Sequence, residues 1–175
     1  MSTRQHSGVT TGPRRVLIAA PARVIRELGG LFLDDAVEVV GAQTWDEALS
    51  ALDSAKPDLL IVCYAFDEAR PFRLFQHLRS DRRKAHLPTI LVRSLPVRLG
   101  ATQAAAIRTS YETLGVDEFF NLHDEKARQG ADAALRQFRE SVLNRLPRQA
   151  APDPKKGSEQ FSRNGHFARL ARRAQ

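Results

Sequence analysis

Apolar residues in this chain occur in short continuous runs that alternate with longer stretches of helical spacing. The clearest run follows Pro57, continues through residues 59–62 and ends at Cys63. It is rich in Leu, Ile and Val and too short for a core helix, so it predicts a central strand buried on both faces of a parallel sheet. Ligands of open parallel sheets bind outside the carboxyl ends of the strands. Cys63 is therefore the first candidate site residue.

The remaining pattern predicts a regular alternation of strands and helices. Short apolar runs predict strands over residues 16–20, 37–41, 88–92 and 116–121. Apolar residues at helical spacing predict helices over residues 22–33, 71–79, 101–114 and 124–146. Thr44, with Glu47 three residues later, marks the start of a further helix that ends before Pro57. Strands that alternate with helices in this way predict an α/β domain whose parallel sheet is covered on both faces.

The two ends of the chain differ in composition from the middle. Residues 1–14 are polar and are predicted to be a disordered tail. Residues 15–146 have the length and apolar content of one compact domain. Residues 147–175 begin with a stretch typical of linkers and are predicted to be a second disordered tail. No apolar run approaches 18 residues, so we expect no membrane-spanning segment.

The net charge of +7 belongs to the two ends of the chain. Residues 1–15 contain three Arg and no acid, and residues 147–175 contain seven Lys or Arg against two acids. Residues 16–146, with 17 basic and 18 acidic residues, are close to neutral. The C-terminal tail also has the composition of a short basic amphipathic helix, so its candidate binding residues are Phe167, Arg169, Leu170, Arg172 and Arg173.

Five segments, taken in order, resemble the receiver (CheY-like) domain of bacterial two-component response regulators. They are Trp45 to Leu49, Lys56 to Val62, Phe72 to Asp81, Ala85 to Val92 and Leu114 to Phe119. The resemblance covers residues 15–146. It implies a flavodoxin-like (βα)5 doubly wound parallel sheet with strand order 2-1-3-4-5 and a role in phosphorelay signal transduction.

The resemblance also implies that the phosphorylation site is degenerate. The position of the phosphoacceptor aspartate is Cys63, and the two acids that hold magnesium correspond to Ala20 and Pro21. The threonine or serine that ends the fourth strand corresponds to Arg93, and the lysine that ends the fifth corresponds to Leu122. Phosphoryl transfer requires a hard cation and groups that neutralise the transferred phosphate. We therefore expect no catalytic residues, no metal and no cofactor.

Two side-chain arrangements at this edge follow as hypotheses. Arg93 is expected to form an ion pair with Asp67 or Glu68, in the place that a phosphoryl group occupies in an active receiver. Cys63 is expected to pack as a small hydrophobe, although a nearby cation such as Arg93 leaves a reactive thiol as an alternative.

The sequence thus predicts a pseudo-receiver, a non-enzymatic module that binds a partner protein without phosphorylation. A histidine kinase or another signalling protein is the expected partner. Two alternatives remain: a nucleic-acid-binding accessory protein that uses the basic tail, and a redox sensor that uses Cys63. The single Cys fits a cytoplasmic location, because the chain has no internal disulfide to form.

Overall fold

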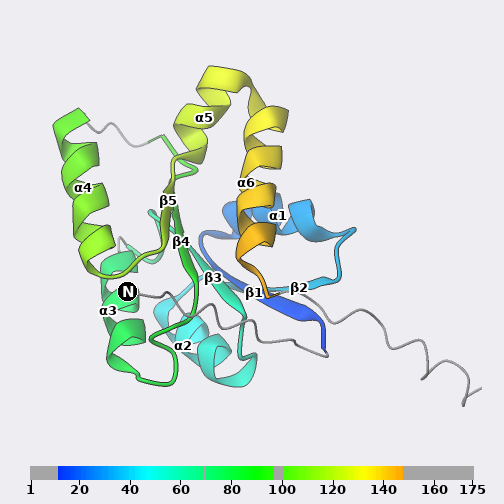
Figure 1. The fold of residues 1–175 in the computed structure, drawn as a ribbon, viewed down its shortest axis with the longest axis vertical. Coiled ribbons are helices and arrows are strands. Elements are labelled where there is room, and N and C mark those ends of the chain that lie inside the picture. Colours follow the sequence, from blue (N-terminus) through cyan, green and yellow to red (C-terminus); the bar gives the residue numbers. More distant parts are fainter. Residues whose placement is uncertain (1–11, 69, 97–100, 148–175) are drawn as a thin grey trace, which may run out of the picture. The chain divides into compact units, whose positions relative to one another are not determined.

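A computed structural model describes residues 12–68, 70–96 and 101–147. Five parallel strands form one sheet in the order β2-β1-β3-β4-β5, with β3 as the central strand (Figure 1). The strands are β1 Arg14–Ala19, β2 Val37–Ala42, β3 Leu59–Cys63, β4 Thr89–Val92 and β5 Glu118–Phe120. The predicted flavodoxin-like order is confirmed.

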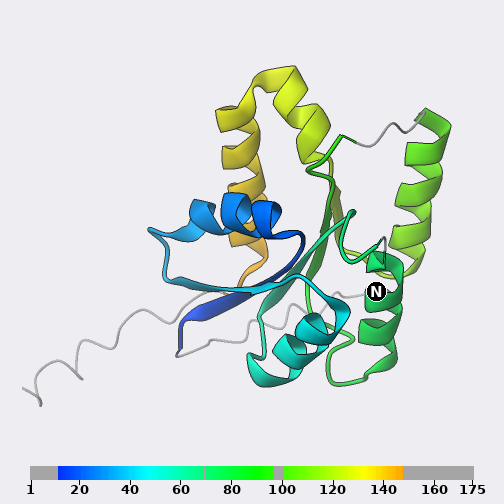
Figure 2. The same cartoon turned by 180° about the vertical axis from the view of Figure 1, so that it is seen from behind.

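Helices cover both faces of this sheet. They are α1 Ala22–Gly29, α2 Trp45–Ser54, α3 Pro71–Ser80, α4 Ala101–Thr113, α5 Leu122–Gln129 and α6 Ala131–Arg145, with the short 3₁₀ helix η1 Gly30–Phe32 after α1. Figures 1 and 2 show α1 and α6 on one face and α2 and α3 on the other. Tyr111 of α4 packs on Phe75 of α3, so α4 belongs to the α2–α3 face.

The core consists of two clusters, one on each face of the sheet. Successive strand residues point to opposite faces, so Val16 and Ile18 join the α1–α6 cluster while Leu17 and Ala19 join the α2–α3 cluster. Every residue of β3 is buried. The predicted role of this apolar run as a central strand covered on both sides is therefore confirmed.

Two predicted helices differ from the observed ones. The helix predicted over residues 124–146 is two helices, because Gly130 between them has a φ of +87°, which no right-handed helix accommodates. The first of these begins at Leu122, since the side chain of Asn121 accepts a hydrogen bond from the N–H of Asp124. The helix predicted over residues 22–33 ends at Gly29 and continues as the 3₁₀ turn η1.

Arg79 of α3 organises the edge of the sheet where the strands begin. Its guanidinium donates hydrogen bonds to the carbonyl oxygens of Ala85 (2.6 Å), Leu87 (3.2 Å) and Gly115, and to the hydroxyl of Thr89 (2.9 Å). One side chain thus connects α3, the loop that follows it, the start of β4 and the turn before β5.

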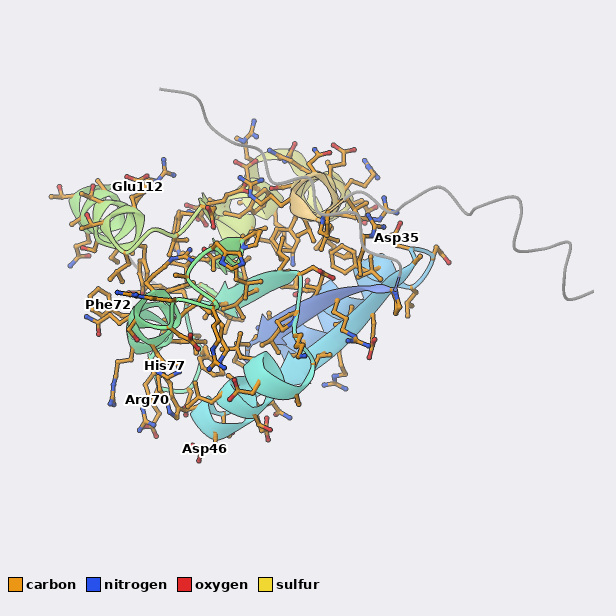
Figure 3. The ribbon with its side chains drawn as sticks, turned by 60° about the horizontal axis from the view of Figure 1, so that its bottom comes forward. Asp35, Asp46, Arg70, Phe72, His77 and Glu112 are labelled. Atoms are coloured by element: carbon orange, nitrogen blue, oxygen red, sulfur yellow. The ribbon has the colours of Figure 1, made fainter. Side chains whose placement is uncertain are left out.

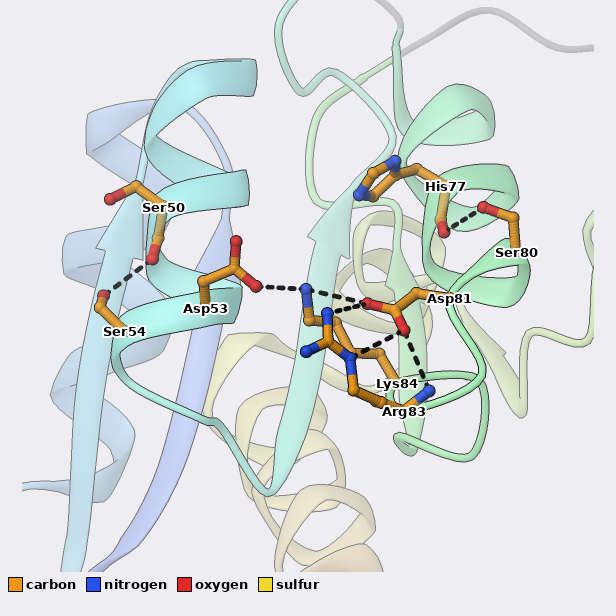
Figure 4. Close-up of polar contacts among 8 residues, drawn as sticks. All are labelled: Ser50, Asp53, Ser54, His77, Ser80, Asp81, Arg83 and Lys84. Atoms are coloured by element: carbon orange, nitrogen blue, oxygen red, sulfur yellow. Dashed lines mark hydrogen bonds and ion pairs between the residues drawn. The ribbon is translucent and has the colours of Figure 1, made fainter.

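A second polar network joins α2 to the loop after α3 (Figure 4). Lys84 forms ion pairs with Asp53 of α2 and with Asp81, and Asp81 also accepts hydrogen bonds from Arg83. The hydrogen bond from the backbone N–H of Arg83, followed by its side chain, lowers the pKa of Asp81 to about 2. The hydrogen bond from Lys84 likewise lowers the pKa of Asp53. Both carboxylates are therefore charged at neutral pH and hold α2 and α3 together.

Within the described residues, no helix combines the length and the apolar character that a membrane crossing requires.

Candidate functional site at the carboxyl edge of the sheet

The register of the strands brings the predicted site positions to one edge of the sheet. Ala19 of β1 lies opposite Val62 of β3, and Cys63 at the end of β3 lies opposite Val92 of β4. Val92 in turn lies opposite Phe120 of β5. The residues that end these strands or directly follow them therefore share the carboxyl edge, as the sequence predicts.

Three of these residues form an apolar plug. Ala20, Cys63 and Leu122 are each fully buried and belong to the same cluster on the α1–α6 face. The Sγ atom of Cys63 lies 3.6 Å from the hydroxyl oxygen of Ser94, which is also buried. Pro21 is the residue before α1, and its backbone is extended rather than helical. At these positions the hydrophobic core continues to the edge of the sheet.

Arg93 lies at this edge but does not have the partner that we expected. Its side chain is 8% exposed, and its Nη1 atom lies 3.3 Å from a carboxylate oxygen of Asp124 in the first turn of α5. The backbone of Arg93 also connects β4 to the β5–α5 junction: its N–H donates to the carbonyl of Phe120, and its carbonyl accepts from the N–H of His123, both at 2.9 Å. Arg93 therefore braces β4 against α5.

The expected pairing of Arg93 with Asp67 or Glu68 is wrong, because both acids have other partners. Asp67 and Glu68 lie 3.6 and 3.8 Å from the guanidinium of Arg70. A carboxylate oxygen of Asp67 also accepts a hydrogen bond of 2.9 Å from the N–H of Trp45, the first residue of α2. That contact places a negative charge at the amino end of a helix, where the helix dipole favours it. Asp67 thus anchors the start of α2 instead of pairing with Arg93.

Asp124 is the site residue that sequence reasoning missed. The sequence does contain a pattern that indicates it, because Asn121 is a suitable N-cap residue and Asp124 is an acid in the first turn of the helix that follows. We expected the helix to begin at about residue 124, which hid this pattern. The true start at Leu122 turns Asp124 toward the end of β4.

The side chains at the carboxyl edge do not fit a magnesium ion. Magnesium requires oxygen ligands from carboxylates, and Ala20 and Pro21 carry none. The nearby acids Asp67 and Asp124 are engaged by Arg70 and Arg93. Among the described residues, no three His, Cys, Asp or Glu side chains gather as a metal site.

The redox alternative requires a reactive thiol at Cys63. A reactive thiol needs solvent access, and Cys63 has none. The tail residues Phe167, Arg169, Leu170, Arg172 and Arg173, which the nucleic-acid alternative would use, lie outside the described residues.

The described part of the chain also contains an open hollow of about 490 Å³. It lies between α1 and the edge strand β2, away from the carboxyl edge. Ile25, Phe32, Leu33 and Val39 are among the residues that line it.

Solved structures that resemble this chain have the receiver fold. A putative response regulator from Chloroflexus aurantiacus has a TM-score of 0.56 and 18% identity, covering 78% of this chain and 99% of its own. The phosphorylated cyanobacterial phytochrome response regulator RcpA has a TM-score of 0.60 and 14% identity, with coverages of 79% and 96%. The receiver domain of a histidine kinase from Syntrophus aciditrophicus has a TM-score of 0.55 and 18% identity, with coverages of 80% and 97%.

No protein-family model and no curated protein sequence matches the chain. The fold is nevertheless that of a response-regulator receiver domain, the class that the sequence pattern predicts.

Proposed function

We propose that this protein is a non-enzymatic pseudo-receiver, a signal-transduction module that binds a partner protein without being phosphorylated. The observation that carries the proposal is the plug formed by Ala20, Cys63 and Leu122. These residues occupy the positions of one magnesium acid, the phosphoacceptor and the phosphate-binding lysine of the receiver pattern, and all three are buried in the core.

The chemistry of phosphoryl transfer supports this reading. The reaction depends on positioning and on neutralising charge on the transferred group, so an enzyme needs a held cation and a nearby donor. An apolar plug supplies neither of them. The cation at this edge, Arg93, is paired with Asp124, and this pair supports one fixed arrangement of β4 and α5. We propose that the module therefore presents its surface to partners without a phosphorylation step.

The partner that we propose is a signalling protein such as a histidine kinase. The receiver fold supports this choice, and one of the similar structures is the receiver domain of a signal transduction histidine kinase. Binding would use the folded surface of the domain, and affinity would not depend on acetyl phosphate or magnesium.

The single tryptophan makes a sensitive test of the site. The backbone N–H of Trp45 donates a hydrogen bond to Asp67, which lies in the loop just after β3. A cation bound at the carboxyl edge would therefore perturb the fluorescence of Trp45. We expect no saturable change up to about 10 mM magnesium, because no carboxylate pair is available there. We also expect no beryllofluoride-induced shifts in the amide NMR spectrum and no phosphate incorporation from acetyl phosphate.

Cys63→Asp is the matched control for this test. It returns a carboxylate to the acceptor position but leaves Ala20, Pro21 and Leu122 unchanged, so we expect it to remain unphosphorylated. Saturable magnesium binding of millimolar or tighter affinity, or stoichiometric phosphate uptake by the unmodified protein, would contradict the proposal. A partner that binds only after acetyl phosphate treatment would contradict it as well.

A further inference from the structure

Helices α2 and α3 present opposite charges on neighbouring exposed faces. On α2, the side chains of Asp46 and Asp53 are exposed, with Ser50 between them. On α3, Arg73 is exposed, and Arg70 directly precedes the helix. Figure 3 shows Asp46, Arg70 and His77 on the same side of the domain. An acidic helix thus lies beside a basic one on a single surface.

The contacts between the two helices hold this surface in one arrangement. The ring of His77 meets the ring of Trp45 edge to face at 5.9 Å, and the guanidinium of Arg73 lies 5.7 Å from the centre of the same ring. At the opposite ends of the helices, Asp53 and Asp81 share Lys84 (Figure 4). The surface is therefore formed before any partner arrives, which lowers the entropy cost of docking.

Part of the charge on this surface takes no part in an ion pair between described residues. None of the ion pairs between described residues includes Asp46 or Arg73. Between the two charged stripes lie apolar groups that remain partly exposed, Trp45 and Leu49. Partly exposed aromatic and aliphatic groups with charges around them have the composition of a protein interface.

We propose that the α2–α3 surface is the interface of a two-fold symmetric dimer of this chain, in which α2 of each copy docks against α3 of the other. Both helices have ten residues and both follow the carboxyl ends of strands, so their amino ends lie level. The two-fold axis lies in the interface between the two copies and runs parallel to α2 and α3, level with the gap between these helices. Rotation by 180° about this axis places α2 of one copy opposite α3 of the second. This operation brings Asp46 toward Arg73 of the other copy.

A second copy is the occupant that this charge pattern fits best. An isologous interface requires a surface that is complementary to itself, and an acidic helix beside a basic helix of equal length meets that requirement. An acidic or a basic partner of another kind would match only one of the two helices. The dimer is independent of the proposed function, because it uses none of the residues Ala20, Cys63 and Leu122 on which that proposal rests.

The direct measurement is the mass of the 175-residue protein in solution by analytical ultracentrifugation. Over about 10 to 500 µM protein we expect the weight-average mass to rise from 19.5 kDa toward twice that value. Raising the salt concentration from about 0.05 to 0.5 M should weaken the association, because screening shortens the range of the exposed charges. A protein that stays at 19.5 kDa over this range at low salt would overturn the proposal.

Charge reversal tests which surface is used. Asp46→Arg with Ser50→Arg makes the α2 face basic, and Arg73→Glu with Gln76→Glu makes the α3 face acidic; all four positions are exposed. We expect each double variant to lose at least about tenfold in self-association. Glu140→Arg with Asn144→Arg on α6 changes the net charge by as much as the α2 variant, and it should associate like the unmodified protein. Circular-dichroism melts check that each variant is folded.

Mixing the two double variants gives the decisive result. The reversed α2 of one variant faces the reversed α3 of the other, and the remaining pair of faces is unmodified, so the mixture should form heterodimers even though each variant alone is monomeric. A mixture that stays monomeric would overturn the proposal. So would equal losses in the α2 variant and the α6 control, since they would show a net-charge effect instead of a specific surface.

Discussion

Truncating Arg79 to alanine should be among the most destabilising changes of a single charged residue in the described domain. The guanidinium donates four hydrogen bonds, three of them to backbone carbonyls, and it also lies 3.5 Å from a carboxylate oxygen of Asp117. These contacts reach three segments of the chain outside α3. Arg79→Ala would remove all of them at once and leave the accepting oxygens without this donor.

The magnitude follows from the number and exposure of these bonds. A hydrogen bond from a charged donor contributes about 1.5 to 3 kcal/mol to stability. The side chain of Arg79 is 21% exposed, so water can replace part of what is lost. We therefore expect Arg79→Ala to lower the free energy of unfolding by about 3 to 4 kcal/mol, which is much less than four independent full contributions. Domain stabilities are typically about 5 to 15 kcal/mol, so this change would be large.

Urea denaturation followed by circular dichroism measures the effect. The midpoint should fall while the slope with denaturant stays constant, because the native surface buried is unchanged. Arg79→Lys should give an intermediate loss, since a lysine ammonium cannot reproduce the planar fork of donors. Arg82→Ala is the matched control at an exposed position of the following loop, and it should stay within about 0.5 kcal/mol of the unmodified protein. A loss below about 1 kcal/mol for Arg79→Ala would refute this account of the edge.

Two further predictions concern the carboxyl edge and the α3–α4 contact. Arg93→Ala should lower the free energy of unfolding by about 1 to 2 kcal/mol. Asp124→Asn should lower it by less, because Asp124 is 60% exposed and water can solvate it. An Arg93→Ala variant as stable as the unmodified protein would contradict the proposed link between β4 and α5. Burial raises the pKa of Tyr111 to about 12, above its usual value of about 10 in the unfolded chain. The contribution of the neutral Tyr111 hydroxyl to the free energy of unfolding should therefore be constant below pH 10 and be lost as the pH rises toward 12. Urea melts at a series of alkaline pH values measure this loss, and Tyr111→Phe should remove it. An unchanged profile in Tyr111→Phe would show that another group is responsible.

The local pattern of the chain was sufficient for much of the fold. The apolar run that ends at Cys63 identified the central strand, and the spacing of apolar residues located the other strands and most helices. These features are predictable because strand and helix periods are properties of neighbouring residues. The order of the sheet and the positions at its carboxyl edge came from the resemblance to receiver domains. That register brings Cys63 level with Val92, next to Arg93, as expected.

The partners of individual charged side chains were decided only by the tertiary structure. Arg93 has at least three acids within a few residues of the strand ends, and the sequence does not rank them. The choice of Asp124 depends on where α5 begins, which Asn121 determines, and on the anchoring of Asp67 at the start of α2. Arg79 likewise shows no sign in the sequence that it will reach Gly115, 36 residues away. The free energy of apolar burial is proportional to the buried area, so the residues that are buried follow from the apolar pattern alone. A hydrogen bond or an ion pair instead needs two atoms, often far apart in the sequence, at a separation defined to a few tenths of an ångström. Only the packed chain sets that separation.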